Sequence, residues 1–139
     1  MHFNLFTIII LSIISYIADV KTGKDIYQNC IGDNSIKLEL LIHHFINVFA
    51  QFGWLIDNKY ILYCYIVLPV ILMIHWKSNN DKCAVSQDIN RKCNIPNNPP
   101  LRDLWYFIGL KDVKYYSYIQ KTYLLSVWLY AIYKLKYKF

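Results

Sequence analysis

Charged residues are scarce in this chain, and glycine and proline are scarcer still. Of its 139 residues, 17% are charged, whereas an ordinary soluble domain carries about 25%. Glycine and proline number four each, which excludes collagen-like and low-complexity chains. The length and a hydrophobic content of 56% exclude a disordered chain and a multi-domain enzyme. The composition therefore indicates a membrane protein.

The sequence also lacks the short motifs of common catalytic sites. It contains no G-x-S-x-G, no H-E-x-x-H and no P-loop. We therefore name no catalytic residue and expect a protein that is not an enzyme. Acidic residues are few, and 15 Lys and Arg against 9 Asp and Glu leave a net charge of +6. Because the lysines lie beside apolar segments, as anionic lipid headgroups favour, we expect no nucleic-acid partner.

Four apolar stretches predict an all-α fold, a polytopic transmembrane bundle of about four helices with a single membrane domain. A spanning helix needs about 20 residues, with a lower limit near 17. The predicted spans cover residues 3–20, 36–56, 60–76 and 115–133. Only Asp57, Asn58 and Lys59 separate the second span from the third, so these two form a central antiparallel hairpin. A polar loop is predicted at 77–98 and a short interfacial helix at 100–110, after Pro99 and Pro100.

The first stretch has two interpretations. Its apolar part, Leu5 to Ala18, has the length of a signal-peptide core and falls short of a full span. However, no Lys or Arg precedes it, and Tyr16 is poorly suited to the −3 position for cleavage after Ala18. We favour a retained helix over a cleaved signal.

The distribution of positive charge predicts which side of the membrane the loops occupy. With four spans, four Lys or Arg lie on the side of both termini and ten lie in the two long loops. The positive-inside rule then places these loops, with Cys30, Cys83 and Cys93, in the cytosol as reduced thiols or metal ligands. A cleaved signal would place them outside, where Cys83 and Cys93 could form a disulfide. The absence of any Asn-x-Ser/Thr site fits the cytosolic alternative, which we favour.

Histidines in the central hairpin are the main candidate site. Counted from the turn, His43, His44 and His75 lie at similar depths, about 18–22 Å along their helices at 1.5 Å per residue. Neutral imidazole is a common ligand of metals and haem, so these three are candidate cofactor-binding residues. Alternatively, they hydrogen-bond within the bundle and hold helices together. We favour this second interpretation, and thus no cofactor.

Two further sets of polar residues accompany the histidines. Asn47 and Gln51 continue a polar stripe from His44 toward the turn, and we expect it to face other helices rather than lipid. Cys83 and Cys93 are candidate metal ligands that could complete a zinc site. Their separation is not a familiar zinc spacing.

Part of the chain resembles a known family. His44, Phe45 and Gly53 on one helix, followed after the next helix by Cys83-Ala84-Val85-Ser86, resemble a bacterial family of small membrane proteins of unknown function. That family carries an H…F…G helix and a C-P-L-T motif, whose last three positions differ here. The resemblance covers about residues 43–93, implies a four-helix membrane architecture and singles out His44 and Cys83. In style, the chain is also similar to small membrane proteins of large DNA viruses of eukaryotes.

These observations predict a small, multi-pass integral membrane protein. We expect a non-enzymatic structural or interaction component of a cellular or viral membrane. Its expected partners are the lipid bilayer and either further copies of the chain or other membrane proteins. The alternative is a haem- or metal-binding membrane redox protein that uses the histidines of the hairpin.

Overall fold

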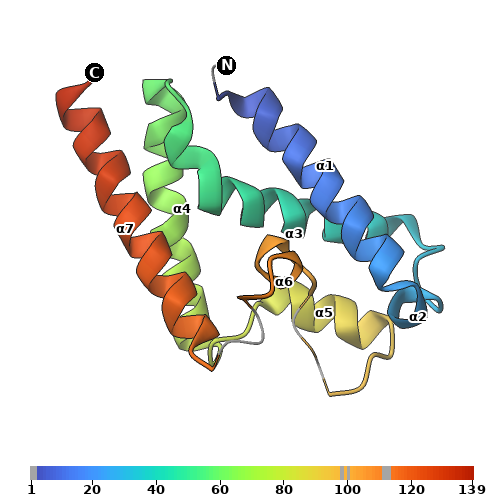
Figure 1. Cartoon of the computed structure of the whole chain (residues 1–139). Helices are drawn as coiled ribbons and strands as arrows, with labels where there is room; N and C mark the ends of the chain where they lie inside the picture. The colour runs from blue at the N-terminus through green and yellow to red at the C-terminus, as the bar shows by residue number, and fades with distance from the viewer. Residues whose placement is uncertain (1–2, 98, 100, 111–113) are drawn as a thin grey trace.

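The described part of the chain is helical and contains no strand. The computed structural model describes residues 3–97, 99, 101–110 and 114–139, and the predicted all-α class is confirmed (Figure 1). The helices are α1 (Leu5–Thr22), α2 (Lys24–Tyr27), α3 (Asn34–Phe52), the 3₁₀ turn η1 (Gly53–Leu55), α4 (Lys59–Ser78), α5 (Ala84–Lys92), α6 (Leu104–Phe107) and α7 (Tyr116–Tyr137).

Short polar side chains fix where the long helices begin. Asn4, Asp33 and Asn58 each adopt an extended backbone conformation. The side-chain oxygen of each accepts a hydrogen bond from a backbone N–H in the first turn of the following helix. Such caps satisfy N–H groups that have no acceptor within the helix. With Asn58 as its N-cap, α4 begins only a few residues after η1 ends.

The long helices pack in two pairs. α3 packs mainly against α1, and α4 packs mainly against α7 (Figure 1). This differs from the predicted central hairpin. α3 and α4 are joined by a short connection, but they diverge beyond it and each packs mainly against another helix. One reason is His44 of α3, whose ring nitrogens find their partners, Ser15 and Asp19, on α1 instead of α4.

The connection between α3 and α4 depends on a close approach. An added Cβ at Gly53 would lie 2.5 Å from Cδ2 of Tyr65, and the Tyr65 hydroxyl donates a hydrogen bond to the Ala50 carbonyl at 2.9 Å. From α7, the buried Nζ of Lys134 donates to the carbonyls of η1 and its flanks and pairs with Asp57 at 2.6 Å. Lys134 therefore ties α7 to the α3–α4 connection at this end of the bundle.

The opposite end of the bundle carries a small cap. We use this name for the described residues of 23–33 and 79–110, which hold α2, α5 and α6. A disulfide joins Cys30 to Cys93, and both half-cystines lie in an apolar cluster with the start of α3. The predicted loop 77–98 is therefore wrong in part, because it contains α5. The predicted interfacial helix is reduced to α6, and its predicted start at Pro100 lies outside the described residues.

Two helices, α1 and α4, are long and apolar enough to cross a membrane. Only 22% of the apolar window of α1 and 17% of that of α4 are buried, so neither resembles the core helix of a soluble protein. Their apolar side chains are exposed in rows, for example Ile14 at 55% and Ile74 at 64%. Exposed apolar surface of this extent marks contact with a membrane or a partner. α3 and α7, the other two predicted spans, do not meet the same test.

Candidate functional site: a cavity beneath the cap

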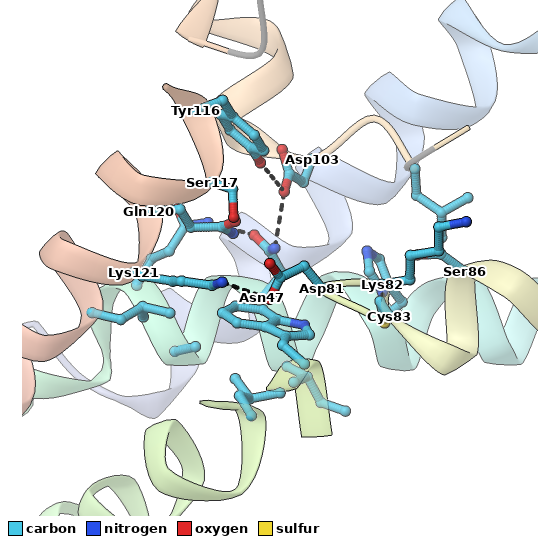
Figure 2. Close-up of a pocket in the computed structure, with 18 of the residues that line it drawn as sticks. Asn47, Asp81, Lys82, Cys83, Ser86, Asp103, Tyr116, Ser117, Gln120 and Lys121 are labelled. Carbon is cyan, nitrogen blue, oxygen red and sulfur yellow. Dashed lines mark hydrogen bonds and ion pairs between the residues drawn. The ribbon is translucent and has the colours of Figure 1, made fainter. Parts of the chain in front are cut away.

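A cavity of about 400 Å³ lies where the cap meets the long helices. Its walls come from the middle of α3, the end of α4, the start of α5, the start of α7, and Pro99, Leu101 and Asp103 (Figure 2). Figure 2 shows Ser117 and Gln120 of α7 on one side, with Cys83 and Ser86 on the other. Small-molecule sites have volumes of about 300–1,000 Å³ and mix apolar walls with a few polar groups. This cavity has both properties.

A buried carboxylate is the centre of the polar wall. Oδ2 of Asp103 accepts hydrogen bonds from Nδ2 of Asn47 at 3.1 Å and from the Tyr116 hydroxyl at 3.5 Å (Figure 2). Oδ1 accepts from the backbone N–H of Tyr106 at 3.1 Å, which caps α6. Gln51 extends the network by donating to Asn47 at 2.6 Å. Burial raises the pKa of Asp103, and these hydrogen bonds oppose that rise.

A thiol–imidazole pair occupies the wall nearest to α5. Sγ of Cys83 lies 3.8 Å from Nδ1 of His43, within hydrogen-bonding distance for sulfur. Cys83 holds the N-cap position of α5, where no side chain caps the helix. The neighbouring Ala84 N–H donates to Nε2 of His75 at 3.1 Å. His43 and His75 are thus both placed at the start of α5, but only His43 contacts the thiol.

His44 points away from this cavity, toward α1. Its Nδ1 lies 2.9 Å from the Ser15 hydroxyl, and its Nε2 lies 3.1 Å from Oδ2 of Asp19. Tyr27 also donates to Oδ2 of Asp19, at 3.0 Å. This order of serine, imidazole and carboxylate is that of a hydrolase triad, but every member is at most 2% exposed. No substrate can reach this network, so its role is structural. It joins α1 and α2 to α3.

The residues predicted as cofactor or metal ligands do not come together in one site. His43, His44 and His75 have separate partners, and within the described ranges no group of three or more His, Cys, Asp or Glu could hold a metal ion. Cys93 is bonded to Cys30, so it has no thiolate for a metal. This corrects the predicted pairing of Cys83 with Cys93, both as zinc ligands and as a disulfide.

Two important acidic residues were not predicted. They are Asp19 of α1 and Asp103, the N-cap of α6. The partners that connect them to α3, His44 and Asn47, lie 25 and 56 residues away in the sequence, so no local motif reveals these contacts. The sequence carries little signal for α5, because of the four residues that it buries at helical spacing, Ser86, Ile89, Asn90 and Cys93, only two are apolar.

Comparison with known proteins adds no relative. No family model matches this chain, and no curated protein or solved structure shows significant similarity to it.

Proposed function

We propose that this chain is a multi-pass integral membrane protein that binds a small ligand in the cavity beneath the cap. In this proposal α1, α3, α4 and α7 cross the bilayer, and the protein acts as a binding component of that membrane. The observation that carries the proposal is the cavity itself, lined by apolar side chains and a few polar groups at the end of a bundle whose outer faces are apolar.

The arrangement of helix ends supports four spans. Both termini and the turn between α3 and α4 lie at one end of the bundle, and the cap lies toward the other (Figure 1). α7 exposes a face of tyrosine and leucine, including Tyr133 at 59% and Leu129 at 54%, as expected for a helix in contact with lipid and its interface. In the middle of α3, His44 points toward α1 and Asn47 toward the cavity, so these two polar residues do not require contact with lipid.

The disulfide supports a location of the cap in an oxidising compartment. Disulfides persist in secretory and extracellular spaces and are rare in the cytosol. The charge count predicts the opposite side, since ten of the positive charges lie in the loops. We give the disulfide more weight, because it joins two buried half-cystines within an apolar cluster.

Labelling of single cysteines in sealed vesicles tests the topology. In a Cys64→Ser, Cys83→Ala background, Lys24→Cys reports on the cap and Phe139→Cys on the other end. A membrane-impermeant maleimide should label position 24 only from the lumenal side and position 139 only from the cytosolic side. Labelling of both positions from one side, or release of the protein by alkaline carbonate, would contradict the proposed spans.

A pair of tryptophan variants tests the cavity. Ser117 lines the cavity, and Ser126 lies nine residues further along α7, outside it and exposed. Native mass spectrometry of protein released from its membrane should show a bound small molecule in the wild type and in Ser126→Trp. Ser117→Trp should lose it. Equal occupancy in all three proteins, or no bound molecule in any, would argue against ligand binding in this cavity.

A further inference from the structure

We propose that Cys83 is a nucleophilic thiol that accepts an acyl group from a small carboxylic ester or thioester held in the cavity. This inference rests on the proposed ligand-binding role of the cavity and gives that ligand a chemical class. It depends on three independent features of the structure: a base beside the thiol, a helix N-terminus beneath it, and a buried carboxylate in the same cavity.

The base is His43, held in place by its neighbour. Its Nδ1 is 3.8 Å from Sγ of Cys83, within hydrogen-bonding distance for sulfur, so the imidazole is placed to act as the base for this thiol. The ring of His43 meets the ring of His44 edge-on, with centroids 5.6 Å apart and planes at 82°. His44 is itself fixed by Ser15 and Asp19. The buried network between α1 and α3 therefore positions the base.

The N-terminus of α5 favours negative charge at the thiol. Cys83 is the N-cap of a nine-residue helix with no side-chain cap, and first-turn N–H groups of such a helix stabilise a thiolate. The Ala84 N–H donates to His75. Other first-turn N–H groups of α5 can stabilise the oxyanion that forms when a carbonyl is attacked.

Asp103 supplies the opposite charge for the base. It lines the same cavity, is 7% exposed, and its negative charge partly offsets the burial that disfavours a protonated His43. A carboxylate near the imidazole stabilises the imidazolium that appears once the thiol has given up its proton. Lys121 cannot neutralise this carboxylate as its ion-pair partner, because its Nζ pairs with Asp81.

The reaction balances without an oxidant, reductant or metal. The Sγ proton of Cys83 moves to Nδ1 of His43, and the thiolate attacks the acyl carbonyl carbon. A carbon–sulfur bond forms, and the bond from that carbon to the ester oxygen or thioester sulfur breaks. The leaving alkoxide or thiolate takes the proton from His43. An acyl thioester on Cys83 and a free alcohol or thiol result, and water or another nucleophile can then release the acyl group.

The other free cysteine is a matched control. Cys64 is exposed on α4, and no thiol–imidazole hydrogen bond involves it within the residues described. Full-length protein in lipid nanodiscs is mixed with p-nitrophenyl hexanoate, and p-nitrophenolate release and intact mass are followed. Wild type and Cys64→Ala should gain one acyl group per chain, mapped by digestion to Cys83. Cys83→Ala and Cys83→Ser should gain none, and His43→Gln should react about 100-fold more slowly.

The pH profile separates a base from a merely structural imidazole. The pH profiles of acylation for the wild type and for His43→Gln should differ in shape, because only the wild type has an imidazole that can take the thiol proton. Identical profiles, or equal acylation of Cys64 and Cys83, would overturn the proposal. So would unchanged acylation in Ser117→Trp, because the reaction would then bypass the cavity. If Cys83→Ala still binds the ligand and the wild type is not acylated, only this inference is refuted. If no ligand binds in the cavity, the proposed function is refuted.

Discussion

At the scale of single residues, the most consequential side chain is His44. It is fully buried and contacts Ser15 and Asp19 of α1, while its ring edge meets the neighbouring His43. Oδ1 of Asp19 is buried without a hydrogen-bond partner in the described structure, so the interactions at Oδ2 carry the whole compensation for burying this carboxyl group. Burial also raises the pKa of Tyr27, which keeps its hydroxyl protonated as a donor to Asp19.

Replacing His44 should therefore destabilise the protein strongly. His44→Ala leaves Asp19 with Tyr27 as its one side-chain partner, and loss of one member of a buried pair costs about 3 kcal/mol. Thermal unfolding in detergent measures the effect. Ser12→Ala is the control, because that buried hydroxyl donates only to Ile8 within its own helix. A loss no larger than that of the control would show that the network does not hold α1 to α3.

Asp103 gives stability a defined pH dependence. Burial raises its pKa above the usual 3.8, so the unfolded chain releases this proton at lower pH than the folded protein does. Stability from this group is therefore fully present below about pH 4 and is lost as pH rises through the higher folded pKa. Asp103→Asn removes the titrating group and keeps a side chain that can cap α6.

Unfolding measured at a series of pH values should separate the two proteins. The wild type should lose stability relative to Asp103→Asn as pH rises from about 4. Above the folded pKa, the difference between them should become constant. Parallel curves would mean that Asp103 titrates in the folded protein as it does in the unfolded chain. Asp57 titrates in the opposite sense, because Lys134 and Lys138 lower its pKa to about 2, and it is common to both proteins.

At the scale of helices, the decisive position is the end of α3. Gly53 lets Tyr65 of α4 pack against the turn, where its hydroxyl reaches the Ala50 carbonyl. Gly53→Ala would force a methyl group to within 2.5 Å of the Tyr65 ring. Overpacking of this kind costs about 1–3 kcal/mol.

Gly32 provides the matched comparison, because nothing lies within 4 Å of the Cβ it would gain. Chemical unfolding of Gly53→Ala and Gly32→Ala in the same detergent should show a loss of stability for the first and little change for the second. Equal stability of the two variants would show that the α3–α4 connection accommodates the added methyl group without loss of stability. The α3–α4 geometry described above would then not depend on glycine.

The positions of the long helices could be predicted from the sequence, whereas their pairing could not. The apolar stretches predicted the positions of α1, α3, α4 and α7 to within a few residues, because composition over a long segment determines where helices form. Pairing depends on single polar residues such as His44, whose partners lie on α1, and so the hairpin prediction gave the wrong neighbours. α5 was missed because its charged face dominates its composition. In the candidate site, His43 and Cys83 were named from the sequence, whereas Asp103 was not.

At the scale of the whole molecule, α1 is an integral part of the fold. It is the principal packing partner of α3, and cleavage after Ala18 would remove Ser15 from the buried network and leave Asp19 at a new terminus. We therefore expect the mature protein to retain residues 5–22. Intact mass spectrometry of protein recovered from its membrane checks this, and a mass corresponding to a start at Asp19 would contradict it.

The cap depends on a covalent link between distant parts of the chain. Cys30 and Cys93 are 63 residues apart, and closing a loop of that size stabilises a folded protein by about 4 kcal/mol in the chain-entropy model. The double variant Cys30→Ala, Cys93→Ala should therefore lower the unfolding temperature and loosen α5 against α3. Since α5 carries Cys83, hydrogen exchange in α5 should increase, and acylation of Cys83 should slow. Cys64→Ala should leave both unchanged, because Cys64 lies on α4 outside the cap. If the double variant matched the wild type in exchange and reactivity, packing around Ile89 and Leu40 alone would hold the cap in place.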